Sequence, residues 1–257
     1  MYSYDAAKKP FKPIIKRPKD DSPFNKSRRI QAEYERSLRG VAREVTKLIR
    51  GYDPKDILSV ERLKKALYAY AEIIEPWGRK TIGKLLQDVA NQDARAWQKH
   101  TQQMSMALRK EVQNTPLGDV FKRLADENVN LIKSIPIEAA QRVHSLVNEN
   151  LFQSARAEEI ATKIMETERI THNRAILIAR TEISRASSVL TETRAKKIGS
   201  SGYIWRTSGD LIVRESHRKM NGVFVKWDEP PILDRMRGHA GCLPNCRCWP
   251  LPIFPEG

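Results

Sequence analysis

The chain has 257 residues, of which 40% are hydrophobic and 30% are charged, and it carries a formal net charge of +15. This length allows one large domain or two modest ones, each with its own apolar core. It contains no run of 18 apolar residues, so we expect no membrane-spanning helix, and the N-terminus lacks the apolar core of a signal peptide. The excess of positive charge favours a polyanionic partner.

Residues 1–29 have the composition of an extended arm. They contain four prolines, which break helices, and nine lysine or arginine residues against three aspartates. Such a segment cannot bury a core by itself, so it is either a solvated tail or a strap that orders against a partner. The candidates for contact with DNA or a protein partner are Lys8, Lys9, Lys12, Lys16, Arg17, Lys19, Arg28 and Arg29.

From about residue 31 to residue 197, apolar residues recur at the spacing of successive helices. We predict that one helix ends at Thr115, that the next follows Pro116, that another starts at Pro136, and that Ser154 caps a short helix after it. The apolar stripes are narrow and the faces between them are strongly charged. This pattern predicts an elongated helical body.

The last predicted helix of the body, from about residue 172 to residue 197, differs from the others. Thr181, Ser184 and Ser188 place small hydroxyl side chains on one side, where another element can approach closely. Arg180 and Glu182 then need partners there, unless they belong to a surface ion-pair face.

After Gly199, which should end this helix in a left-handed conformation, the composition changes. Residues 203–207 and 223–227 are short, aromatic and β-branched, which predicts two strands. Six of the fourteen prolines fall in the last 28 residues, so we expect the chain to finish as an extended, proline-rich tail.

Between the predicted strands, a helix should run from Leu211 to Met220 with Asp210 as its N-cap. On that helix Asp210, Arg214, His217 and Asn221 would form one polar stripe. An exposed polar face is the simplest explanation of such a stripe, and a binding face is the alternative.

All three cysteines lie within seven residues near the C-terminus. They cannot all pair within the chain, which favours a cytoplasmic origin. Thiolates and imidazoles are the ligands of tetrahedral zinc sites. Cys246 and Cys248 could therefore bind one structural zinc ion with His217, and His239 or Cys242 would complete the set. The alternative is that the thiols are buried as small apolar groups.

Several of these residues, taken in order and spacing, resemble the Mu F-like minor head proteins of tailed phages over roughly residues 135–252. Where that family often has a histidine before the proline of its C-terminal motif, this chain has Leu243. The residues that carry the resemblance are Arg180, Glu182, Trp205, Asp210, Arg214, His217, Gly222, Pro244, Cys246, Arg247 and Cys248.

The resemblance implies a head morphogenesis protein of the virion, present in few copies at the portal or inside the procapsid, and in the host cytoplasm during assembly. We therefore expect the portal protein, the procapsid interior and double-stranded DNA as partners, the DNA without sequence preference, and neither a membrane nor a small-molecule substrate. The expected fold is mainly α, with an arm (1–29), an elongated helical body (30–199) and a small α+β unit (200–257).

Two other functions compete with this interpretation. A metal-assisted hydrolase or nuclease could use Asp210, His217 and the cysteine cluster, although no pair of carboxylates adjoins that cluster as two-metal nucleases require. A free DNA-binding protein of the host would account for the charge and the arm, but would leave the C-terminal motif unexplained.

Overall fold

The computed structural model describes residues 28–52, 57–103, 105–153 and 157–253. The helices are α1 (Arg28–Arg50), α2 (Ile57–Ile73), α3 (Glu75–His100), the 3-10 turn η2 (Thr101–Gln103), α4 (Met106–Gln113), α5 (Gly118–Gln153), α6 (Ala157–Lys197) and α7 (Glu215–Lys219). The strands are β1 (Gly202–Arg206), β2 (Phe224–Lys226), β3 (Ile232–Leu233), β4 (Met236–Arg237) and β5 (Trp249–Pro252).

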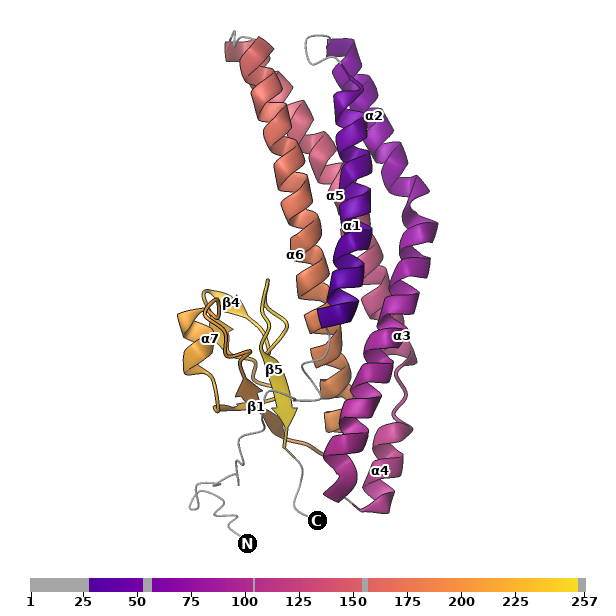
Figure 1. The fold of residues 1–257 in the computed structure, drawn as a ribbon, viewed down its shortest axis with the longest axis vertical. Coiled ribbons are helices and arrows are strands. Elements are labelled where there is room, and N and C mark those ends of the chain that lie inside the picture. The colour runs from indigo at the N-terminus through magenta and orange to yellow at the C-terminus, as the bar shows by residue number, and fades with distance from the viewer. Residues whose placement is uncertain (1–27, 53–56, 104, 154–156, 254–257) are drawn as a thin grey trace, which may run out of the picture.

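The long helices run side by side along the longest axis of the molecule, and α2 and α3 together form one of the columns (Figure 1). The strands and α7 form a small unit beside one end of α6, and α4 lies at the same end of the body as the C-terminal end of α3. This arrangement confirms the predicted mainly α fold, with an elongated helical body and a small C-terminal α+β unit.

Helix α1 shows how the sequence positions the body. Tyr34, Leu38, Val45 and Ile49 recur every three to four residues or at multiples of that spacing, and all four are buried. Charged residues occupy the opposite face, so one side of α1 packs against α6 while the other side meets solvent. Each fully buried side chain of this size contributes about 1.5–3 kcal/mol to folding.

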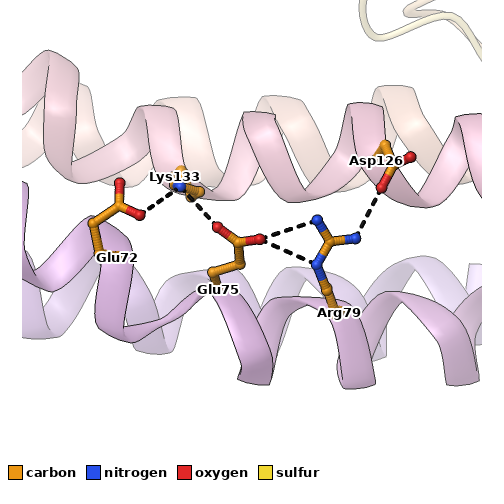
Figure 2. Close-up of polar contacts among 5 residues, drawn as sticks. All are labelled: Glu72, Glu75, Arg79, Asp126 and Lys133. Carbon is orange, nitrogen blue, oxygen red and sulfur yellow. Dashed lines mark hydrogen bonds and ion pairs between the residues drawn. The ribbon is translucent and has the colours of Figure 1, made fainter.

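Ion pairs bind the column formed by α2 and α3 to α5 (Figure 2). The Lys133 ammonium lies 2.9 Å from a carboxylate oxygen of Glu72 and 2.8 Å from one of Glu75. The guanidinium of Arg79 contacts Glu75 at 3.0 Å and Asp126 at 2.8 Å. Most of these groups are well exposed, so the network favours this alignment of the helices more than it adds stability.

Several helix boundaries differ from those predicted. Pro136 starts no new helix, because α5 continues through it and the buried side chains of Ile135 and Ala139 on either side keep the helix packed despite the missing N–H donor. Helix α6 is likewise continuous where two helices were expected, and Ser154 lies outside the described residues. The helix expected to run on to Thr115 is interrupted, because α3 ends at His100 and α4 follows it. The predicted break at Thr115 and Pro116 is confirmed, since α4 ends at Gln113 and α5 starts at Gly118.

The small unit is built on a three-stranded antiparallel sheet in the order β2-β1-β5. The two predicted strands are confirmed as β1 and β2, whereas β5 falls in the tail that we expected to be merely extended. Pro250 and Pro252 lie in β5, where they pair with Trp205 and Tyr203. Proline is tolerated there because β5 is an edge strand, whose outer side needs no backbone donors.

The predicted helix from Leu211 to Met220 is wrong, because α7 spans only Glu215–Lys219. The side chains of Leu211 and Ile212 are 98% and 77% exposed, so no packing would stabilise the two missing turns. Asp210 instead starts a turn in which the Val213 amide donates to its carbonyl. It therefore does not lie in helical register with His217.

A second apolar core joins the small unit to the body. Trp97 of α3 and Ala195 of α6 are buried with Tyr203, Trp205 and Trp227 of the small unit. This core holds the small unit against α3 and the C-terminal end of α6. None of the described helices combines the length and the apolar character that a membrane span requires.

Candidate metal centre

Three side chains capable of binding metal meet in the small unit. The Nδ1 atom of His217 lies 3.4 Å from the Cys246 sulfur and 3.6 Å from the Cys248 sulfur. All three side chains are buried, and their ligand atoms lie within 4.8 Å of one another. Among the described residues, this is the group of histidine, cysteine and carboxylate side chains that could hold a metal ion.

A tight turn brings the two sulfurs to the histidine. The Cys246 amide donates to the Leu243 carbonyl at 2.9 Å, which closes a four-residue turn. Pro244 occupies its second position, and Asn245 occupies its third with a φ of 56°. A proline followed by a residue with positive φ is the pattern of a type II turn, and asparagine tolerates that φ better than most residues. The residues of this turn therefore account for the local geometry.

The predicted hydroxyl stripe on α6 receives this loop, which confirms that another element approaches there. Ser188 donates through its hydroxyl to the Ala240 carbonyl at 2.6 Å, and the Asn245 amide donates to the Thr181 hydroxyl at 3.1 Å. Gly241, with a φ of 85°, lies so close to α6 that an added Cβ would overlap the Ser188 hydroxyl. The cysteine loop is thus fixed to the helical body.

The two sulfurs differ in their preferred protonation. A hydrogen bond from the Cys248 thiol, aided by His217 and the Gly241 amide, lowers the pKa of Cys246 to about 4. The same interaction raises the pKa of Cys248. The pair therefore favours a thiolate at Cys246 that accepts a hydrogen bond from the Cys248 thiol. Thiolate is the form of cysteine that binds metal.

Asp234, which we did not single out in the sequence, lies on the far side of the histidine. Its Oδ2 atom is 4.0 Å from His217 Nε2, which has no hydrogen-bond partner among the described residues. The Ser216 hydroxyl donates to the same oxygen at 3.0 Å. Asp234 and Arg235 have positive φ angles, as the turn of a two-residue hairpin requires. The strands of that hairpin have two residues each, too short for a periodicity signal.

Neither proposed fourth ligand belongs to the group. His239 uses both ring nitrogens elsewhere, with Nδ1 3.2 Å from the Tyr203 hydroxyl and Nε2 3.0 Å from the Trp227 carbonyl. Burial raises the pKa of Cys242 to about 12, so its thiol is neutral at physiological pH. The structure therefore brings together three of the five candidate ligands.

The candidate polar residues divide between two places. Arg247 donates to Asp210 at 2.8 Å, and Arg214 donates to the Pro244 carbonyl, so these residues bind the cysteine loop to the loop after β1. Glu182 is instead buried in the body, where it accepts hydrogen bonds from Asn128 and Arg185.

The remaining polar candidate, Arg180, lies on α6 beside α1, and two of the arm candidates lie at the start of α1. Arg180 is exposed and lies 3.5 Å from Glu35 of α1. Arg28 and Arg29 form the first turn of α1, and both are exposed. The other candidates for DNA or partner contact lie outside the described residues.

Comparisons with known proteins place the site within a family region. Residues 141–250, which include His217, Cys246 and Cys248, match the family described as phage Mu protein F like protein. The chain is 29% identical over 153 residues to an uncharacterized protein of Haemophilus influenzae, covering 59% of this chain and 34% of the relative.

A second relative is NAD(+)--arginine ADP-ribosyltransferase EFV of Enterococcus faecalis, 31% identical over 130 residues. That match covers 45% of this chain and 26% of the relative. The chain thus spans about a third or less of the length of these curated relatives. No solved structure matches it significantly. Residues 141–250 are therefore similar to the phage Mu protein F-like family.

Proposed function

We propose that the protein is a structural component of a tailed-phage head that acts in head morphogenesis and contacts the portal and the packaged DNA. The observation that carries this proposal is the match of residues 141–250 to the phage Mu protein F-like family, since this region contains the whole of the metal-ligand group. The three ligand side chains are buried, as in a structural metal site.

The proposed DNA contact rests on charge. The chain has 46 lysine and arginine residues against 31 acidic ones, and Arg28 and Arg29 are exposed at the start of α1. Lysine and arginine side chains release condensed counterions when they meet DNA phosphates, which drives binding that is independent of sequence. The sequence has no recognised motif for reading a DNA groove. The basic arm (1–29) would act as a strap on the portal or on DNA.

The metal in this proposal is one zinc ion bound by His217, Cys246 and Cys248. Zinc binds cysteine sulfur at about 2.3 Å and histidine nitrogen at about 2.0–2.1 Å, so neighbouring nitrogen and sulfur ligands lie about 3.6 Å apart in a tetrahedral site. The observed separations of 3.4 and 3.6 Å fit these edges. Asp234 behind the histidine matches the carboxylate that commonly orients a histidine ligand.

Zinc at this position would cross-link α7 to the C-terminal tail. Three protein ligands leave a fourth position for a water molecule. The described part of the unit has short strands and one five-residue helix, so such a cross-link would replace part of the apolar burial that it lacks.

The number of ligands also favours a second candidate function, a metal-dependent enzyme, because catalytic zinc sites have three protein ligands and one open position. A metal-assisted hydrolase would then use His217 and Asp210, but Asp210 already accepts hydrogen bonds from Arg247 and from the Ile212 amide. Cleavage of DNA by the zinc-loaded chain, abolished in both Asp210→Ala and His217→Ala, would establish this activity. Uncut DNA over long incubation would exclude it.

Mass spectrometry of purified phage particles tests the proposed function. We expect peptides of this chain in the particles at far fewer copies than the major capsid protein. Comparison of particles before and after DNA release would show whether the chain stays with the head. Complete absence of its peptides from both mature particles and procapsids would contradict a structural role in the head.

A further inference from the structure

A cavity of about 650 Å³ lies beside the metal-ligand group. The first turn of α1, the middle of α6, the loop after β1 and the cysteine loop all contribute to its walls, and His217, Cys246 and Cys248 are among its lining residues. Its volume is within the range of pockets that hold small ligands, about 300–1,000 Å³. Segments far apart in the sequence therefore form one ligand-sized space.

The lining of this pocket is strongly basic. It contains four arginines from four separate segments, and none of the described residues that line it is acidic. Three of them have acidic partners outside the lining, since Arg247 contacts Asp210 at 2.8 Å, and Arg180 and Arg214 approach Glu35 and Asp234, each at 3.5 Å. The four arginines are Arg28, Arg180, Arg214 and Arg247.

Polar atoms of the lining residues also lack hydrogen-bond partners. The Ser208 hydroxyl, Nη1 of Arg214 and Nε2 of His217 are buried without a hydrogen bond from any described residue. The Arg214 group can only donate a hydrogen bond, and the hydroxyl can do so. Buried donors without acceptors are costly and therefore rare in folded proteins. Asp234 lies 3.5 Å from Nη1 of Arg214, too far for a good hydrogen bond. An acceptor in the pocket would complete these hydrogen bonds, and the four arginines favour an anion in that place.

We propose that this pocket binds a phosphate group carried by a nucleotide-sized ligand. A guanidinium group matches two phosphate oxygens at once, and a phosphate offers oxygens to several arginines together, whereas a carboxylate offers two. The cavity is larger than an isolated phosphate, which leaves room for a sugar and a base. The phosphate could belong to a free nucleotide or to a nucleotide of a DNA strand. This inference does not depend on the proposed role in the phage head.

Calorimetric titration of the full chain tests the inference. The probes are deoxyadenosine monophosphate, inorganic phosphate, deoxyadenosine, and a single-stranded oligonucleotide with and without a 5′ phosphate. The variant is Arg180→Gln, because this side chain is exposed and serves neither core. The matched control is Arg169→Gln, an exposed arginine of the same helix that also has an acidic neighbour, Glu166 at 3.0 Å.

We expect deoxyadenosine monophosphate to bind and deoxyadenosine not to bind. Arg180→Gln should weaken the phosphate-dependent binding about tenfold, as loss of one charge-assisted hydrogen bond implies, and Arg169→Gln should change it less than about twofold. Binding of the oligonucleotides alone, with the same dependence on Arg180, would identify a strand phosphate as the ligand. Thermal unfolding of both variants checks that the fold is intact, and Ser208→Ala replaces Arg180→Gln if that variant is unstable.

Three results would overturn the inference. One is that none of the phosphate-bearing probes binds. Another is that deoxyadenosine binds as tightly as its monophosphate. The third is equal weakening by Arg180→Gln and Arg169→Gln, which would show attraction to the overall charge of the chain and no specific pocket. Because all the titrations use purified protein, they are independent of the particle measurements that test the proposed function.

Discussion

Asp93 of α3 is a buried carboxylate at the junction of three helices. Its oxygens accept hydrogen bonds from the Thr191 hydroxyl and from Arg194 Nε of α6, both at 2.8 Å. Arg194 also donates to the Val112 carbonyl of α4 at 2.6 Å. Burial raises the pKa of Asp93 to about 6 and outweighs the opposite effect of Thr191 and Arg194.

This raised pKa predicts an unusual response to mild acid. The folded protein takes up a proton on Asp93 near pH 6, whereas the unfolded chain does so near its ordinary value of 3.8. Asp93 therefore adds to the free energy of unfolding as the pH falls from about 7 to about 4.5, and this gain is lost as the pH rises through about 6. As the pH falls over this range, the free energy of unfolding of the wild type should rise by about 1–2 kcal/mol relative to that of Asp93→Asn.

Denaturant titrations of both proteins across that pH range measure the difference. The exposed Asp119 provides the control, since Asp119→Asn should follow the wild type throughout. If the wild type and Asp93→Asn show parallel dependence on pH, burial does not govern the ionisation of Asp93.

At the scale of elements, the contact between α6 and the cysteine loop decides how the small unit is held. Gly241 has a φ of 85°, and an added Cβ would overlap the Ser188 hydroxyl and lie 3.0 Å from the Cys248 carbonyl oxygen. Gly209 has a similar φ of 73°, but an added Cβ there meets no atom within 4 Å. The two glycines therefore separate backbone strain from close packing.

Gly241→Ala should lower the free energy of unfolding by about 2 kcal/mol more than Gly209→Ala, because both variants carry strain at positive φ and only one also forces α6 and the loop apart. Chemical denaturation monitored by tryptophan fluorescence measures both, since Trp205 and Trp227 are buried in the small unit. Equal losses in the two variants would mean that the approach to α6 contributes nothing.

Local signals predicted some of these elements well. The hydroxyls at Thr181, Ser184 and Ser188 indicated a close approach to α6, and Gly199 ends that helix with a φ of 78° as its position suggested. Both signals depend on chemistry that acts within a few residues, namely small side chains and a left-handed cap. Such features can be read from the sequence.

Elements that depend on distant packing were predicted less well. Pro136 was taken as a helix start, although packing of its neighbours on both sides keeps α5 continuous. Strand β5 was missed because its two prolines are acceptable only on a sheet edge, which the sequence alone does not reveal. Asp210 was assigned to the helix of His217, and the two are separated by a turn. Part of the site, including Asp234, therefore could not be predicted from the sequence and is visible only in the structure.

At the scale of the whole molecule, the net charge of +15 and the proposed DNA contact predict a steep dependence of binding on salt. The logarithm of the association constant should fall linearly with the logarithm of salt concentration and should be equal for duplexes of scrambled sequence. Replacement of Arg28 and Arg29 by glutamine should reduce the slope by about two if each contacts one phosphate.

Fluorescence anisotropy with labelled duplexes measures these slopes. Lys47→Gln, near the other end of α1, is the control and should leave the slope unchanged. A marked preference for one duplex sequence, or an unchanged slope in the double variant, would argue against sequence-neutral binding through the start of α1.

The small unit lies mostly within residues 141–250 and packs against Trp97 of α3, outside that range. Zinc is the proposed cross-link within this unit. Metal binding by His217, Cys246 and Cys248 would be linked to folding, because the ligands come together only in the folded unit. The alternative is that the thiols are simply buried and that the unit relies on its apolar core alone. Cys242 is near in sequence but outside the ligand group, so it offers a matched control.

Elemental analysis of the protein, purified without chelators, tests this account most directly. We predict about one zinc ion per chain in the wild type and in Cys242→Ser, with loss of zinc and of thermal stability in Cys246→Ser and in Cys248→Ser. If the wild type contains no bound metal, and both of the latter variants are as stable as the wild type, the proposed zinc centre is contradicted.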